Sequence, residues 1–287
     1  MTPVCRLPAP FDAEKYSRLR IGIYDDPEVA VYVNEAGDFA HLSPLTTTDY
    51  SHYESRVKRF GLGNYKKENR IFDLRYEKLA SLFAGARSFI EIGAGDGGFL
   101  AHVQERHPDV DYASIEPDEN TRNERSAHSW LQQFESIGVA PAGRFELVGL
   151  FHVLEHVLEP ASLLRGCANL LSPNGRLIIE VPSLNDPLLS LYRLKSYEDF
   201  FFQRQHPFYY SASSLERLLR FHDLNVERMI FHQRYGIENH LNWLLAGKPG
   251  GSPQFRSIFM HTDRSYRESL EASGHADAVM AIAMRAD

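Results

Sequence analysis

The sequence predicts an α/β fold in which helices cover both faces of a mostly parallel sheet. From Ser88 onward, short apolar segments with the length of buried strands alternate with helical segments. A glycine-rich turn follows the first of these strands and leads directly into a helix. The chain has 287 residues, of which 43% are hydrophobic, and this is enough for a sizeable core.

The N-terminal part of the chain has a pattern of its own. Residues 20–33 are rich in β-formers and alternate in polarity, with a turn near Pro27, so a hairpin or a small meander is expected. Residues 50–83 have a helical pattern that is interrupted near residues 61–64. We therefore expect a small α+β accessory region over residues 1–80.

Strands and helices alternate in the part that follows. The predicted strands span residues 89–92, 110–115, 145–150 and 176–181. The predicted helices between them span residues 97–107, 118–134 and 160–171. Because helical segments separate the strands, we expect the strands to pair in parallel.

The C-terminal part is expected to complete the sheet. Ser213 to Glu216 has the spacing of a helix-capping box. After it come a predicted strand at 225–231, a helix near 263–272 and an apolar strand at 276–284. The two strands are expected to pair antiparallel at one edge. The insert between them combines aromatic and amide side chains that suit sugar stacking with three leucines expected to pack on the core, Leu241, Leu244 and Leu245.

Composition excludes several classes of function. The formal net charge of −7 argues against a nucleic-acid partner, because such a surface needs clustered Lys and Arg. The N-terminus lacks the apolar core of a signal peptide, and no run approaches the roughly 18 apolar residues of a membrane span. The chain has two cysteines, too few for a four-thiolate zinc site, and no cluster of metal ligands stands out. We expect a cytoplasmic protein without a membrane span, and we assign no metal-binding residues; the sequence leaves a bound divalent metal open.

The turn at Gly93, Gly95 and Gly97 is the clearest candidate for a ligand site. Glycines allow the backbone to approach a ligand closely, and the following helix directs its amides and dipole toward it. A tight turn without a ligand is the ordinary alternative, and Gly98 also completes a dinucleotide-type pattern. Glu91 argues against the dinucleotide, because a buried carboxylate needs a partner. The ammonium group of S-adenosylmethionine (SAM) would supply one, whereas NAD has no such group.

Glu91 to Gly97 resembles motif I of the class I SAM-dependent methyltransferases, E/D-x-G-x-G-x-G. The resemblance implies a Rossmann-like sheet of seven mostly parallel strands with an antiparallel last strand, and SAM as the cofactor. It also implies roles for individual residues. Those expected at the methionyl part of SAM are Glu91, Gly93, Ala94, Gly95 and Gly97. Glu116, followed by Pro117, is expected to bind the ribose, and residues 134–137 lie where the adenine loop is expected.

Later segments extend this resemblance. Residues 145–157, which contain H-V-L-E-H, resemble the fourth strand of the family and its continuation, with Phe151 and His152 beside the cofactor. Residues 170–182 resemble the helix end, P-x-G turn and fifth strand. These blocks imply a SAM-dependent methyltransferase domain over residues 81–287, with an insert at about 233–275.

Histidines are the candidates for catalysis. A hydroxyl acceptor must lose its proton, and histidine suits that task near neutral pH. We predict His156 as the base, with Glu155 orienting it. The alternative is that His156 only bonds to the backbone. His206 is expected in the acceptor pocket, because its segment resembles one in bacterial methyltransferases that modify sugars and polysaccharides, although Gln205 replaces their glutamate.

These expectations combine into a function. We predict O-methylation of a sugar or glycan-type acceptor, since the cysteine-rich zinc module of the related sugar C-methyltransferases is missing. Residues 1–80 are expected to cover the acceptor pocket or to mediate self-association as a homodimer. The alternatives are a small phenol or carboxylate acceptor, an NAD(P)-dependent oxidoreductase that uses the same turn, and a SAM-binding protein without catalysis.

Overall fold

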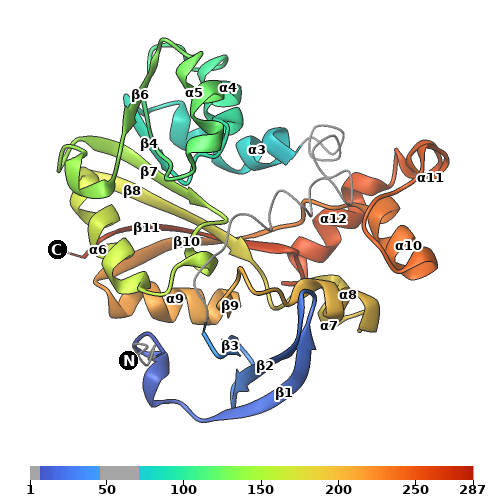
Figure 1. The fold of residues 1–287 in the computed structure, drawn as a ribbon. Helices are drawn as coiled ribbons and strands as arrows, with labels where there is room; N and C mark the ends of the chain where they lie inside the picture. Colours follow the sequence, from blue (N-terminus) through green and yellow to red (C-terminus); the bar gives the residue numbers. More distant parts are fainter. Residues whose placement is uncertain (1–6, 46–70, 287) are drawn as a thin grey trace.

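The computed structural model describes residues 7–45 and 71–286, and within them it contains two sheets. The larger sheet has seven strands (Figure 1). In spatial order they are β10 (Leu224–His232), β11 (Ala278–Arg285), β8 (Leu171–Pro182), β7 (Phe145–Phe151), β4 (Ser88–Ile92), β5 (Asp111–Ile115) and β6 (Leu131–Phe134). Strand β11 pairs antiparallel with both of its neighbours, whereas the pairs from β8 to β6 are parallel. The predicted Rossmann-like sheet with an antiparallel last strand is therefore confirmed.

Helices cover both faces of this sheet, because its central strands bury side chains on both sides. Ile90 and Ile92 belong to one apolar cluster, and Phe89, directly before Ile90 in sequence, belongs to another. The first cluster also contains residues of α6 (Pro160–Leu170) and α9 (Ala212–Phe221). The second contains residues of α3 (Ile71–Phe83) and α4 (Gly98–Gln104). Cys167, in α6, is a fully buried free thiol.

Three predictions for the larger sheet and the helices beside it were wrong. Residues 118–134 form two short helical segments, η2 (Glu119–Thr121) and α5 (Arg122–Ser126), before the edge strand β6. The capping box of α9 uses Ser211 and Ser214, because the helix begins two residues earlier than expected. Strand β8 already begins at Leu171, so the predicted P-x-G turn lies within the strand, where Asn174 has a φ of 62°.

The smaller sheet joins the N-terminal region to the C-terminal half of the chain. Its order is β1 (Tyr16–Ile23), β2 (Asp26–Asn34), β3 (Phe39–Ser43) and β9 (Phe208–Tyr210), all antiparallel. The expected hairpin is confirmed as β1 and β2. A bridge between Ser183 and Tyr210 connects the end of β8 to this sheet. The predicted helical residues 50–70 lie outside the described residues, whereas α3 spans residue 80 and packs on the larger sheet.

The insert forms a group of helices at one end of the molecule (Figure 1). They are α10 (Ile237–Ala246), α11 (Pro253–Phe259) and α12 (Asp263–Ala272), and two further helices, α7 (Pro187–Ser190) and α8 (Lys195–Phe201), lie nearby. The prediction for α10 was wrong about its buried face: Trp243 is buried, whereas Leu244 and Leu245 are exposed. Among the described residues, no helix is both long and apolar enough to cross a membrane.

Candidate functional site

The glycine turn lies between β4 and α4 and has an unusual backbone. Gly93, Gly95 and Gly97 have φ values of 74°, 55° and 81°, a region that side-chain-bearing residues rarely adopt. A Cβ on Gly93 would overlap Cγ2 of Val153, whereas one on Gly95 would meet nothing within 4 Å in the described structure. The turn therefore packs against the protein at Gly93 and faces open space at Gly95.

Glu91 is a buried carboxylate that lacks a complete set of partners. It is 4% exposed, and no described group donates a hydrogen bond to its Oε2. Burial raises the pKa of Glu91 to about 8, an increase that Arg75 opposes and that Asp96 and Glu116 reinforce. A buried carboxylate oxygen without a donor is costly, so its place beside the turn indicates a cationic ligand.

Glu116 connects the glycine turn to a hollow at the end of β5. Its carboxylate accepts hydrogen bonds from the amides of Gly95 and Asp118, both at 2.8 Å. The hollow has a volume of about 590 Å³. Its lining includes Ser114, Glu116, Pro117, Phe134 and Glu135, so the predicted ribose residue and part of the predicted adenine loop share one space.

Arg125, in α5, borders both the hollow and the turn, and sequence reasoning missed it. It is 3% exposed and donates hydrogen bonds to the carbonyl oxygen of Gly95 and to Thr121 Oγ1. Arg125 thus stabilises the conformation of the turn, whose glycines have little conformational preference of their own. Nothing in the local pattern of charged residues around it distinguishes this arginine from a surface residue.

A second buried carboxylate, Glu180, lies at the end of β8 and has a full set of partners. Arg75 donates to it through Nε and Nη2, both at 3.0 Å, while His152 Nε2 lies at 2.9 Å and His232 Nδ1 at 3.3 Å. Burial acts to raise the pKa of Glu180, but Arg75, His232 and His152 more than reverse this effect, so the pKa lies well below its usual range. The Arg75 guanidinium also stacks over Phe151, 4.4 Å from the ring centroid.

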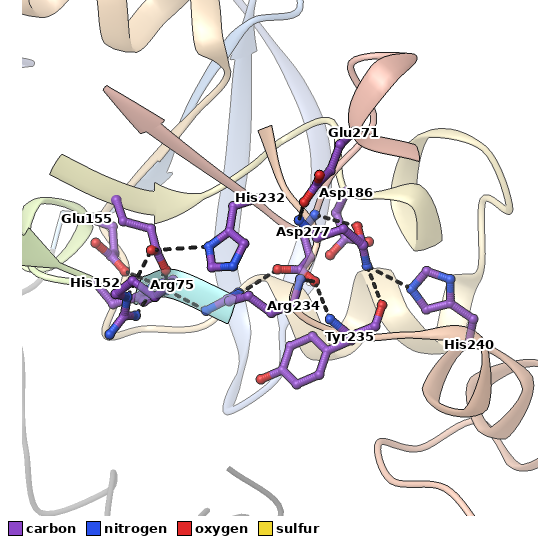
Figure 2. Close-up of polar contacts among 12 residues, drawn as sticks. Arg75, His152, Glu155, Asp186, His232, Arg234, Tyr235, His240, Glu271 and Asp277 are labelled. Carbon is purple, nitrogen blue, oxygen red and sulfur yellow. Dashed lines mark hydrogen bonds and ion pairs between the residues drawn. The ribbon is translucent and has the colours of Figure 1, made fainter. Parts of the chain in front are cut away.

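Figure 2 shows how this network continues toward the insert. Arg234 contacts His152 on one side and bonds to Asp277 Oδ1 on the other. Asp277 Oδ2 also accepts hydrogen bonds from the backbone amides of Arg234 and Tyr235, at 2.8 and 2.9 Å. The polar groups at the ends of β7, β8 and β10 are therefore interconnected and positioned by the insert.

The three predicted catalytic residues lie together. One ligand-type atom from each of Glu155, His156 and His206 lies within 4.8 Å of the others. The rings of His156 and His206 meet edge to face, with centroids 4.6 Å apart. His156 Nδ1 lies 2.8 Å from the carbonyl oxygen of Gln205 and so donates to it. Their roles in catalysis remain a prediction.

His152 and His156 are four residues apart in sequence but do not share a helical face. His152 has a φ of 59°, and only Leu154–His156 forms a short 3-10 turn. The ring of His152 consequently contacts Glu180, and the ring of His156 contacts His206. Glu155 lies closer to His152 Nδ1, at 3.2 Å, than to His156 Nε2, at 4.0 Å.

The other predicted cofactor residues lie around the turn. Ala94 is buried in the same apolar cluster as Phe99 and Phe151. Arg75 and Glu180 are residues of this region that sequence reasoning missed. A carboxylate within the apolar strand 177–181 was a signal of the same kind as Glu91 and could have drawn attention to Glu180.

Comparisons with known proteins are consistent with this geometry. Residues 58–228, more than half of the chain, match a protein-family model described as a methyltransferase domain. The ubiquinone biosynthesis O-methyltransferase of Psychrobacter cryohalolentis is 22% identical over 176 residues. That match covers 61% of this chain and 65% of the relative, so the chain spans less than two thirds of the relative's length.

Two solved structures have a similar fold. One is a SAM-dependent methyltransferase from Archaeoglobus fulgidus, with a TM-score of 0.53 and 14% identity over 77% of this chain and 98% of that one. The other is the 1,6-didemethyltoxoflavin-N1-methyltransferase of Burkholderia thailandensis, with a TM-score of 0.54 and 12% identity over 93% of this chain and 100% of that one. At these identities the similarity concerns the fold.

Proposed function

We propose, from the premise that this chain belongs to the methyltransferase domain family, that it is a SAM-dependent O-methyltransferase with a sugar or glycan-type acceptor. The observation that carries the proposal is the buried carboxylate of Glu91. Within the described part of the chain, its Oε2 has no donor and the glycine turn beside it faces open space at Gly95. An ammonium group supplies the missing partner. A dinucleotide offers no such group, which disfavours an NAD(P)-dependent oxidoreductase.

The residues around the turn suit the parts of SAM. Glu91 would hold the amino-acid end, with the backbone of Gly93, Ala94, Gly95 and Gly97 close to it. The nucleoside part would lie in the hollow lined by Glu116, Pro117 and Phe134. Phe151 ends the neighbouring strand β7, His152 follows it, and both would border the cofactor. When bound, SAM supplies a methyl group that its sulfonium charge already activates.

His156 is the proposed base for a hydroxyl acceptor. Its Nδ1–H donates to the carbonyl oxygen of Gln205, which leaves the proton-accepting lone pair on Nε2. The carboxylate of Glu155, 4.0 Å from that nitrogen, stabilises the imidazolium once the proton has moved. His206, which packs edge to face on His156, would border the acceptor.

The proposed acceptor class rests on the segment around His206 and on the polar insert. Residues 1–80 and the insert at about 233–275 would enclose the acceptor beside the methyltransferase domain, and residues 1–80 would alternatively mediate self-association. The similarity to O-methyltransferases of ubiquinone biosynthesis is a reason to test a second class, small phenols or carboxylates. A screen of nucleotide sugars, glycans and phenols for formation of S-adenosylhomocysteine separates the two classes.

Replacing His156 tests the catalytic role. His156→Ala should lower kcat for a hydroxyl acceptor by about 10²- to 10⁴-fold, while the Kd for SAM measured by calorimetry changes less than about threefold. His222→Ala is a control, because His222 caps the C-terminal end of α9 and belongs neither to the proposed site nor to the two regions proposed to enclose the acceptor. Equal loss of transfer and of SAM affinity would refute the role as base. Binding of NADH but not SAM to the wild type would refute the proposed function itself.

A further inference from the structure

We propose that Glu155, His156 and His206 form a binding site for one divalent transition-metal ion such as Zn²⁺. The first two residues follow β7, and His206 lies just before β9, so two loops bring them together. One potential ligand atom from each residue lies within 4.8 Å of the other two. Two imidazoles and a carboxylate are a ligand set that Zn²⁺ and its neighbours in the first transition row prefer.

The buried state of Glu155 is an independent indication of a cation. Glu155 is 1% exposed, and its Oε2 has no hydrogen-bond partner among the described residues. Its other oxygen, Oε1, lies 3.2 Å from His152 Nδ1. A carboxylate oxygen removed from water without a donor destabilises the fold, and a metal ion at the cluster supplies the missing positive charge.

The surroundings of the two histidines suit metal ligation. Histidines that bind metals usually donate their second ring N–H to a carbonyl or carboxylate, as His156 does to the carbonyl oxygen of Gln205 at 2.8 Å. The amide nitrogen of Gln203 lies 3.0 Å from Nδ1 and 3.2 Å from Nε2 of the His206 ring, while Gln203 Oε1 has no hydrogen-bond partner among the described residues. Rotating that amide by a half turn brings Oε1 to the ring, where it can accept the proton of one ring nitrogen and leave the lone pair of the other nitrogen for the ion.

The geometry also determines what the ion would do. Three protein ligands leave at least one coordination position open, so the ion can take a water molecule or a small anion. On the premise of the proposed function, the metal and the acceptor proton compete for the same nitrogen, His156 Nε2. We therefore expect the bound ion to inhibit methyl transfer. Mg²⁺ is not expected to bind here, because it prefers oxygen ligands.

Metal binding can be measured without SAM or an acceptor. The full-length protein is freed of metal with a chelator and titrated with Co²⁺, followed by visible absorption, and then with Zn²⁺ in competition. Wild type should bind one ion per chain. His156→Ala, His206→Ala and Glu155→Gln should each raise the Kd at least tenfold, since even outer partners of a metal site contribute tenfold to a hundredfold. His222→Ala should bind like the wild type.

His206→Cys provides a signature that a purely structural effect cannot produce. A thiolate at this position should retain Co²⁺ and add a sulfur-to-metal charge-transfer band in the near ultraviolet. Affinity for S-adenosylhomocysteine, measured on the same samples, shows that each variant is folded. The proposal is overturned if wild type binds no Co²⁺, if the ligand variants bind as tightly as wild type, or if Mg²⁺ binds equally well. None of these results bears on the binding of SAM, which is measured separately, so the proposed function can hold even if the metal site does not.

Discussion

Glu91 and Glu180 are both buried at the carboxyl edge of the larger sheet, yet their pKa values move in opposite directions. Arg75 bonds to Glu180 through two nitrogens, and two imidazoles complete its shell, so the ionised form is favoured. Arg75 acts on Glu91 only through its charge, and the effect of burial on the pKa of Glu91 is larger. A fully partnered carboxylate supports the structure, whereas a partly partnered one is left for a ligand.

Glu91→Gln should stabilise the protein without cofactor and weaken cofactor binding. The pKa of Glu91 is about 8 in the folded state and 4.5 ordinarily, so the folded state holds more protons between these values. Wild-type stability therefore falls as the pH rises from 4.5 to 8, and the variant, which lacks this group, should be more stable at pH 8 by at least about 1 kcal/mol. Urea denaturation from pH 5 to pH 8 measures this difference.

SAM affinity of the same variant should fall by about tenfold or more, because a charge-assisted hydrogen bond is lost. Glu28→Gln, an exposed glutamate on β2, is the matched control and should change neither quantity. A stability difference between wild type and Glu91→Gln that is independent of pH would contradict the assignment of the raised pKa to Glu91.

At the scale of elements, the glycines of the turn between β4 and α4 serve different purposes: one is needed for packing and another for ligand binding. Gly93 faces Val153, a β-branched residue with little rotamer freedom, whereas a Cβ on Gly95 would meet none of the residues that the structure describes. Both glycines have a positive φ. A single motif therefore contains one glycine required by packing and one that the protein alone would tolerate losing more easily.

Gly93→Ala should destabilise the fold more than Gly95→Ala. Each change should lower the free energy of unfolding by roughly 1–2 kcal/mol, because alanine is strained in the left-handed backbone region. For Gly93→Ala, the overlap with Val153 should lower it by about 1–3 kcal/mol more. Gly95→Ala should instead mainly weaken SAM binding, because its methyl group projects into the cofactor space. Denaturation and calorimetry on both variants measure these effects. Equal stabilities, or unchanged SAM affinity of Gly95→Ala, would count against this division of roles.

Contiguous elements could be predicted from the sequence, because strand, turn and helix follow one another along the chain. The turn at 93–97 and the strand pattern around it are of this kind. Strand β6 was missed because only Leu131 is buried in it, so no apolar run marks it. The exposed Leu244 and Leu245 were misassigned, because tertiary packing selected Trp243 and His240 for the buried face of α10.

Contacts between distant segments were inaccessible to such reasoning. Arg75 meets Glu180, and Arg125 meets Gly95, only after the helices have packed on the sheet. The grouping of Glu155, His156 and His206 was expected in part, since each was chosen separately as a catalytic candidate. Their suitability as joint ligands follows from the way two loops meet and has no counterpart in local sequence.

At the scale of the whole molecule, the two sheets share their apolar interior. Phe39 of β3 stacks on Phe11 at 3.9 Å, and both belong to the cluster that covers one face of the larger sheet. Leu42, also on β3, belongs to a third cluster that contains Tyr197 and Trp243. The small sheet therefore lies between two apolar clusters and is expected to unfold together with the rest.

Leu42→Ala should lower the free energy of unfolding of the whole protein by about 2–5 kcal/mol, because Leu42 is fully buried. Leu19→Ala, on β1, is the matched control: Leu19 is 51% exposed, and a loss below about 0.5 kcal/mol is expected. Far-ultraviolet circular dichroism and tryptophan fluorescence should report the same transition. An additional, earlier transition in Leu42→Ala would show that the small sheet unfolds on its own.

The pairing of β3 with β9 has a consequence for how the protein is made. Residues 39–41 hydrogen-bond with residues 208–210, so the ribosome must synthesise most of the chain before β3 gains its second neighbour. At about 5–20 residues per second, the delay is on the order of ten seconds or more. During this interval the nascent hairpin exposes a strand edge and the aromatic side chain of Phe39. We expect a ribosome-associated chaperone to bind such an exposed hairpin.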